Sequence, residues 1–163
     1  MRHFSALLGA VAICTLALPA MADPKPRGAK PADGQMIANI YVGKTQNWKT
    51  CKAGIYYGGK GKAQAYCHKE GDKEPGVGIG KWTVTRKGKV CADMIWYWRE
   101  GDGYGSKPND KPDCINHVVD KEGTIWRNWD GNKDWWRLDP KTGVEKGFKY
   151  KSKVNRLRRK LGV

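Results

Sequence analysis

The chain has 163 residues, of which 39% are hydrophobic, and a formal net charge of +15 at pH 7. This length suits one domain with a core of its own rather than several domains. The positive charge predicts attraction to anionic partners, namely lipid head groups, acidic polysaccharides or nucleic acid. The alternative is that the charge serves solubility alone.

The first residues have the pattern of an export signal. A basic start, Met1-Arg2-His3, precedes an apolar run from Phe4 to Leu18, and Ala20-Met21-Ala22 supplies the small residues read by signal peptidase. The apolar run is too short to span a membrane, and no later segment approaches that length. We therefore predict a signal peptide over residues 1–22, an exported protein that is periplasmic or secreted, and no transmembrane segment in the mature chain.

Two short segments come next. Residues 23–34 are rich in proline and glycine, which predicts a flexible leader. From Gln35 to Val42 apolar residues recur at helical spacing, with Asp33 as a candidate N-cap and Gly43 as a candidate C-cap. We expect a short N-terminal helix there, at the start of an antiparallel β domain over residues 35–145.

The four cysteines beyond the signal predict two disulfides, because an even number is typical of exported proteins. Residues 51–67 read as a hairpin around a glycine-rich turn, and a three-residue loop would set Tyr57 opposite Gly61. That register places Cys51 opposite Cys67. In the segment that starts at Cys114, the inward set of Ile115, His117 and Val119 leaves Cys114 pointing outward, as Cys91 does on its own strand. We therefore predict the pairs Cys51–Cys67 and Cys91–Cys114.

Residues 80–98 predict a second hairpin, with strands over 80–85 and 90–98 joined by a short turn. The second strand is apolar on one face and half apolar on the other, which predicts a central place in the sheet. Its tryptophans, together with Trp82, are interpreted as core. A long loop is expected over 99–113, followed by strands near 114–119, 124–129 and 133–138. Strands separated by turns every eight to twelve residues favour an all-β, antiparallel, barrel-like domain, of which a lipocalin-like barrel is one form.

A basic tail over residues 146–163 ends the chain, either as a surface helix or without structure. Its cations are candidate contacts to an anionic surface: Lys149, Lys151, Lys153, Arg156, Arg158, Arg159 and Lys160. Exposed aromatic residues beside cations suit sugar stacking, membrane-interface contact or single-stranded nucleic acid, and export argues against nucleic acid. The alternative is that these aromatic residues pack within the sheet and bind no ligand. The candidate ligand contacts are Tyr104, Trp126, Trp129, Trp135 and Trp136.

No motif indicates a reaction, so we predict no catalytic residue, no cofactor and no metal. The mature histidines, His68 and His117, do not make a zinc site by themselves, and the cysteines are expected to be oxidised. The acids include residues that could form a glycosidase-like pair, but their spacing selects none.

The order of several short motifs resembles a family of small exported bacterial proteins known as domain of unknown function 995. The motifs are Gly43-Lys44-Thr45, Tyr56-Tyr57, Gly80-Lys81-Trp82, Gly88-Lys89-Val90-Cys91, and Cys114 with Val118-Val119. The resemblance covers residues 35–139 and implies an exported, periplasmic all-β domain from a Gram-negative bacterium. It implies no activity. The chain differs from the pattern in its Gly58-Gly59-Lys60-Gly61 turn, where the family has an acidic Asp-Gly, and in its basic tail.

These observations favour a non-enzymatic envelope protein that binds an anionic polysaccharide or glycolipid, with the tail cations supplying long-range attraction. A hydrolase of envelope polymers is one alternative. A secreted structural or membrane-active protein is the other. The oligomeric state and the ligand are left open.

Overall fold

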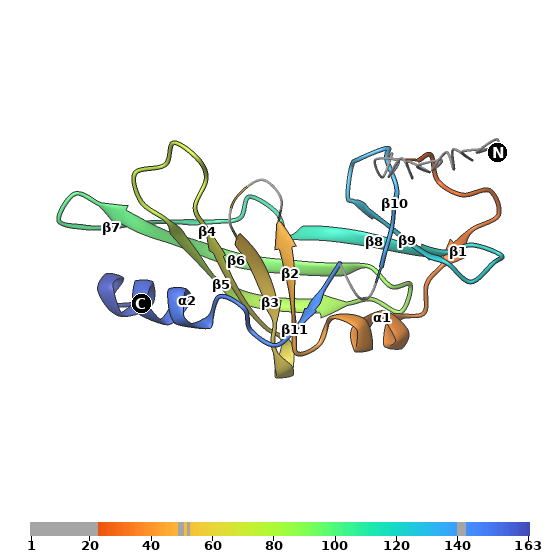
Figure 1. The fold of residues 1–163 in the computed structure, drawn as a ribbon, viewed down its shortest axis with the longest axis horizontal. Helices are drawn as coiled ribbons and strands as arrows, with labels where there is room; N and C mark the ends of the chain where they lie inside the picture. Colours follow the sequence, from red (N-terminus) through yellow and green to blue (C-terminus); the bar gives the residue numbers. More distant parts are fainter. Residues whose placement is uncertain (1–22, 49–50, 52, 140–142) are drawn as a thin grey trace, which may run out of the picture.

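The computed structural model describes residues 23–48, 51, 53–139 and 143–163, so the predicted signal peptide lies outside the described residues. In this part of the chain, eleven strands form one curled antiparallel sheet with two short helices (Figure 1). The elements are β1 (Lys30–Pro31), α1 (Gly34–Tyr41), β2 (Lys44–Trp48), β3 (Ala53–Tyr57), a 3₁₀ turn (Gly59–Gly61), β4 (Lys62–Cys67), β5 (Gly76–Val84), β6 (Val90–Glu100), β7 (Gly103–Pro108), β8 (Asp113–Val119), β9 (Ile125–Trp129), β10 (Trp136–Arg137), β11 (Glu145–Lys146) and α2 (Lys151–Leu161).

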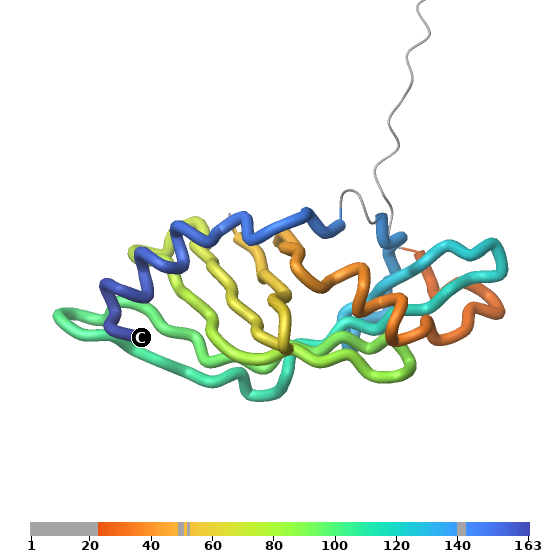
Figure 2. The backbone as a smooth tube through the Cα atoms, turned by 90° about the horizontal axis from the view of Figure 1, so that it is seen from below, coloured from red at the N-terminus to blue at the C-terminus, as the bar shows by residue number. Residues whose placement is uncertain are grey.

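The sheet curls into a half-barrel, which agrees with the predicted all-β, barrel-like class. Its strand order is β10-β9-β8-β6-β5-β4-β3-β2-β11, with β1 added on β8 and β7 on β6. Leu138, just after β10, and Val144, just before β11, belong to opposite edges of the sheet, yet both join the same core cluster as Ile55 and Met94. Edges that meet one core require a curled sheet, and the tube view shows this curvature (Figure 2). We call the face that lines this core the inner face.

The hairpin over 80–98 is confirmed as the centre of the sheet. Strand β5 pairs with β6 from Val84 opposite Val90 to Gly76 opposite Trp98. The first residues of β6 also pair with β8 and its last residues with β7, so β6 has neighbours along its whole length. Trp82, Ala92 and Met94 are buried on the inner face, as the alternation predicts.

The register predicted for the β3–β4 hairpin is wrong by two residues, because the turn is longer than a three-residue loop. Tyr57 lies opposite Ala63 rather than Gly61, with Lys60 in the left-handed conformation at φ 56° within the turn. A shift of two residues leaves every side chain on its predicted face. The Cys51–Cys67 disulfide therefore still forms, with a Cα–Cα distance of 5.7 Å.

The second predicted disulfide is confirmed directly. Cys91 on β6 and Cys114 on β8 are cross-strand partners, with Cα atoms 4.1 Å apart. Disulfides persist in oxidising compartments, so the two bridges indicate a location outside the cytoplasm. No helix in the described part of the chain is long and apolar enough to cross a membrane.

The prediction of a loop over 99–113 is wrong for residues 99–108, most of which belong to strands. Strand β6 continues to Glu100, a tight turn with Gly101 at φ 56° follows, and β7 returns along β6. The glycine permits the left-handed turn that a hairpin needs. Only residues 109–112 connect β7 to β8 without regular structure.

Helix α1 closes one end of the half-barrel. Asp33 caps it by accepting a hydrogen bond from the backbone N–H of Met36, and Ile37 and Tyr41 are buried in the inner core. The leader segment before it runs along the sheet: Lys30–Pro31 pairs with Val118–Val119 as β1, and Ala32 is buried.

The second helix, α2, lies on the opposite face of the sheet, which we call the outer face. Val154, Leu157 and Leu161 recur at helical spacing and are buried against Tyr66 and Val77. Strand alternation sends Tyr66 and Val77 to the face opposite Ala65 and Trp82. Of the two forms considered for the basic tail, the structure has the surface helix (Figure 1).

Candidate functional site

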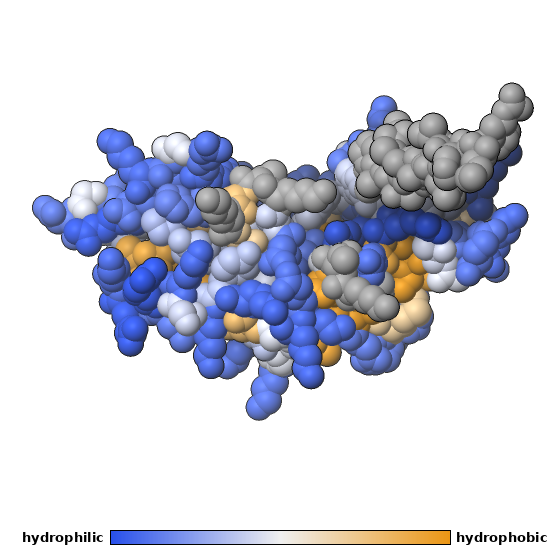
Figure 3. Space-filling view, in the orientation of Figure 1, coloured by the Kyte–Doolittle hydropathy of each residue, from blue (hydrophilic) through white to orange (hydrophobic). Residues whose placement is uncertain are grey.

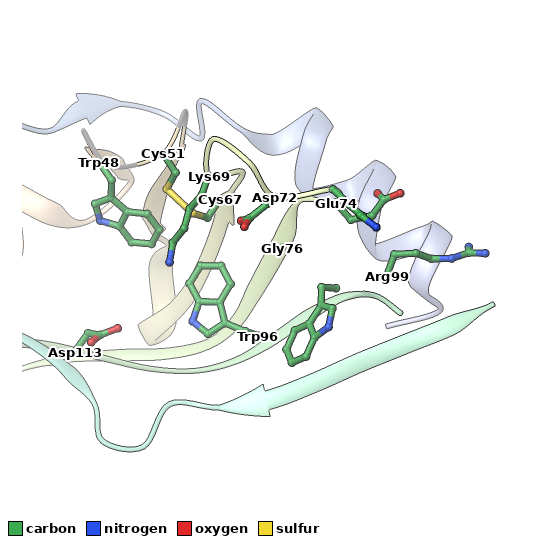
Figure 4. A pocket seen from close by; sticks show the side chains of 12 residues that line it. Trp48, Cys51, Cys67, Lys69, Asp72, Glu74, Gly76, Trp96, Arg99 and Asp113 are labelled. Atoms are coloured by element: carbon green, nitrogen blue, oxygen red, sulfur yellow. A yellow bond between two sulfur atoms is a disulfide. The ribbon is translucent and has the colours of Figure 1, made fainter. Parts of the chain in front are cut away.

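The inner face is hollowed by three adjoining clefts of about 690, 850 and 470 Å³. Trp48 lines the first and second clefts, Trp96 lines the first and third, and Asp113 lines all three. Shared walls make them one depression, which we call the inner groove. In the first cleft, Trp48 and Trp96 lie near the Cys51–Cys67 disulfide, and their ring centroids are 6.0 Å apart (Figure 4).

Tryptophan is the dominant side chain of the inner groove. Five of the eight tryptophans in the chain line it: Trp48, Trp96, Trp98, Trp129 and Trp136. They come from β2, β6, β9 and β10, so the curl of the sheet brings them together. Flat aromatic faces of this kind suit stacking on sugar rings.

A stripe of glycines makes room for these rings. Gly76 and Gly78 on β5 lie opposite Trp98 and Trp96 on β6, and Gly80 lies opposite Met94. A Cβ at Gly78 would come within 3.2 Å of the Trp96 indole, which is closer than ordinary van der Waals contact. The absence of side chains at positions 76, 78 and 80 of β5 therefore leaves this part of the inner face free for the large residues of β6.

Arg127 adds a cation to the second cleft. It stands on β9 directly between His117 on β8 and Trp136 on β10, so all three share the inner face. Its Nη1 atom is buried and has no hydrogen-bond partner in the described part of the chain. The residue as a whole is half-buried, which leaves the guanidinium at the wall of the groove rather than inside the core.

A neutral hydrogen-bonded network lies behind Arg127. The Tyr41 hydroxyl is 2.8 Å from Nε2 of His117, and Nδ1 of His117 is 2.7 Å from the carbonyl oxygen of Gly88. A carbonyl can only accept, so Nδ1–H donates to it and Nε2 accepts from Tyr41. Burial lowers the pKa of His117 to about 4, and the charge on Arg127 acts in the same direction. Burial also raises the pKa of Tyr41.

Asp113 stands where the three clefts meet. Partial burial raises the pKa of its carboxyl group, against a hydrogen bond from Asn109 and the charge of Lys111. Asn109 also accepts a hydrogen bond from the Trp96 indole N–H at 3.1 Å. This chain of contacts fixes the orientation of one tryptophan ring relative to the one carboxyl group at the junction.

The structure brings two of the five predicted aromatic contacts into the groove. Trp129, 39% exposed, and Trp136 both line the second cleft. Trp126 does not line it, because its indole N–H donates to Asp120 at 2.8 Å and its ring lies under Arg137. Trp135 is buried beside the leader, and Tyr104 is exposed on β7, outside the groove.

The predicted cationic contacts lie on α2 and just before it, and none of them lines the groove. Five of them are exposed without an ion pair to any described residue: Lys151, Lys153, Arg156, Arg159 and Lys160. The last three, Arg156, Arg159 and Lys160, form what we call the cationic face of α2. Lys149 pairs with Glu145, and Lys153 lies over the rings of Tyr66 and Tyr150. Arg158 is half-buried, and Lys151 is exposed at the first turn. Hydrophilic side chains cover the area over α2 (Figure 3).

Trp48 and Arg127 were not predicted from the sequence as groove residues, and Trp96 and Trp98 were predicted to lie in the core. Trp96 and Trp98 are half-buried groove walls rather than core residues. The alternating glycines at 76, 78 and 80 were a usable signal, since they mark a strand face that leaves space for a neighbour. No comparable local signal marks Arg127, whose surroundings come from three strands.

Within the described ranges, no group of three or more His, Cys, Asp or Glu side chains is placed to hold a metal ion. No curated protein and no solved structure matches the chain. One family model matches residues 9–155, which is most of the chain, and its description is protein of unknown function (DUF995). The chain therefore belongs to the family of proteins of unknown function DUF995.

Proposed function

We propose that the protein is a non-enzymatic binding module of the bacterial envelope that holds an anionic polysaccharide or glycolipid in the inner groove. The observation that carries the proposal is the groove itself, an open depression walled by five tryptophans. Exposed aromatic rings are costly to leave in water without a partner, and large apolar clefts with a few polar groups are the usual form of ligand sites. The predicted export signal and the two disulfides support a ligand outside the cytoplasm.

The tryptophans supply a first test with a matched control. Trp129→Ala and Trp136→Ala each remove a groove ring, and each is expected to weaken binding about tenfold, the equivalent of one aromatic contact. Trp126→Ala removes the same side chain from the same strand outside the groove, so it is expected to leave affinity unchanged. An array of acidic and neutral oligosaccharides and glycolipids selects the probe, and calorimetry measures affinity for the three variants.

Equal losses in all three tryptophan variants would point to a general loss of structure and contradict a site in the groove. An array without any binding would remove the proposal altogether.

The cationic face of α2 is proposed to attract the anionic polymer before it enters the groove. The variant Arg156→Gln, Arg159→Gln, Lys160→Gln leaves the buried residues of α2 intact. At low salt it is expected to slow association with an acidic polysaccharide at least tenfold, because steering by charge acts on the association rate. Stopped-flow fluorescence at several salt concentrations measures that rate.

A second triple variant carries the same net charge and serves as the control. Arg86→Gln, Lys87→Gln and Lys133→Gln neutralise exposed cations at the other end of the sheet. If both triple variants slow association equally, total charge rather than α2 attracts the polymer.

A further inference from the structure

The Arg127 guanidinium is only partly paired within the described chain, where the Tyr41 side chain interacts with it. Its Nη1 atom is buried without a hydrogen-bond partner there. A buried donor without an acceptor is destabilising, and a charged donor more so, which is why such groups are rare in native proteins. Such a cost at a residue that lines a cleft points to a partner in the bound state.

The surroundings of Arg127 indicate what would satisfy it. Trp129 follows two residues later on the same strand, and Trp136 is the direct cross-strand partner of Arg127 on β10. Alternation along β9 and direct pairing place both rings on the face of the guanidinium. A sugar stacked on either ring would bring its substituents beside the Arg127 guanidinium, which lines the same cleft. A guanidinium binds a planar oxyanion through two parallel hydrogen bonds, a geometry that neutral hydroxyl groups do not match.

The groups on the buried side of Arg127 carry no negative charge at neutral pH. His117 and Tyr41 are both uncharged there, because burial disfavours their ionised forms. Two carboxyl groups, Asp113 and Asp139, line the same cleft as Arg127 and Arg137, so the formal charges of its lining cancel. Recognition by Arg127 therefore depends on the geometry of its guanidinium rather than on a strong positive field.

We propose that Arg127 is the specificity-determining residue of the inner groove and pairs with an oxyanion substituent, a carboxylate or a phosphate, on the bound sugar. This inference rests on the proposed function, because it names the chemical group that the groove selects. It differs from the role of the cationic face of α2, which attracts any polyanion at long range. A pair formed within the groove is screened less by salt than one at the exposed helix.

The test compares ligands that differ only in charge. Trigalacturonate and its methyl ester share the same rings, and trehalose 6-phosphate and trehalose supply the same comparison for phosphate. Wild-type protein is expected to bind at least one acidic member about 10- to 100-fold more tightly than its neutral counterpart, the range of one charge-assisted hydrogen-bonded pair. The preference is expected to persist in 0.5 M salt. The pair that shows it identifies the oxyanion as carboxylate or phosphate.

Three variants assign the preference to Arg127. Arg127→Gln is expected to bind acidic and neutral members equally while keeping the affinity for the neutral member. Arg127→Lys keeps the charge without the two-pronged donor, so it is expected to retain only part of the preference. The control is Arg137→Gln on β10, which removes the same charge from the same cleft and is expected to keep the full preference. Binding of the neutral member reports that each variant is folded.

The outcomes separate the two proposals. Wild-type protein that binds both members of each pair equally, or an Arg127→Gln variant that keeps the preference, overturns the role of Arg127 and leaves the groove as a sugar site. Equal losses in Arg127→Gln and Arg137→Gln also overturn it, because net charge would then be sufficient. Binding to no member of either pair, with Trp129→Ala unchanged on the wider array, contradicts the proposed function itself.

Discussion

Replacing Gly80 with alanine is expected to lower the free energy of unfolding by more than about 3 kcal/mol, enough to prevent folding of a marginally stable domain. A Cβ at this position would lie 1.9 Å from the carbonyl oxygen of Asp93 and 2.7 Å from the Cα of Met94. Both are backbone atoms of β6, so no side-chain rotation relieves the overlap. The central β5–β6 pairing would have to separate.

Gly76→Ala is the matched control for Gly80→Ala. Gly76 lies on the same face of the same strand, but a Cβ there meets the Trp96 ring at 3.5 Å and the carbonyl oxygen of Tyr97 at 3.7 Å, both ordinary van der Waals contacts. This change is expected to be neutral or to stabilise by about 0.5 kcal/mol, because alanine restricts the unfolded chain. Urea unfolding followed by fluorescence, with the disulfides intact, measures both variants. Similar stabilities for the two would show that β5 and β6 can separate locally without loss of the fold.

Local alternation explains which parts of this fold could be predicted from sequence. The faces of β5 and β6 follow from a period of two residues, and the pairs Cys51–Cys67 and Cys91–Cys114 follow from those faces. The β3–β4 register was wrong by two residues, yet an even shift preserves every face. The prediction of disulfides was therefore tolerant of an error in the turn.

The inner groove depends on information that alternation does not contain. The walls of the groove form because the first residues of β6 pair with β8 and its last residues pair with β7. No local sequence pattern specifies that one strand has two different partners along the same edge. Arg127 becomes a groove residue only because β9 and β10 curl toward β2. The spacing of Val154, Leu157 and Leu161 indicated a helix with one apolar face. The many charged residues around them are equally typical of an unstructured tail, so the sequence did not decide between the two.

The pH dependence of stability is expected to come chiefly from His117. In the unfolded chain this histidine has the ordinary pKa of about 6.5, and in the folded protein burial lowers the pKa to about 4. Between these values the unfolded state binds a proton that the folded state does not, so stability falls as the pH falls. The contribution is fully present above about pH 7 and is lost as the pH reaches about 4. A shift of that size corresponds to about 3 kcal/mol.

The network explains why the folded state resists protonation. Nε2 of His117 already accepts a hydrogen bond from the Tyr41 hydroxyl, and the Arg127 charge from β9 disfavours a second cation. Protonation would add a proton where Tyr41 donates, inside a core cluster from which water is excluded. Hydrogen bonds lower the pKa values of Asp120 and Asp130. The stability that these two carboxylates contribute is therefore lost only below about pH 4, the ordinary pKa of an aspartate.

Equilibrium unfolding in urea at pH 7, 6, 5 and 4 measures this dependence, with His117→Asn as the control. The asparagine amide keeps a donor near the Gly88 carbonyl and does not titrate, so the variant is expected to be less stable at pH 7 and nearly independent of pH down to about 5. The wild-type and variant curves should converge as the pH approaches 4, since the histidine loses its advantage there. Parallel curves over the whole range would show that other groups carry the acid sensitivity and that His117 is readily protonated in the folded state.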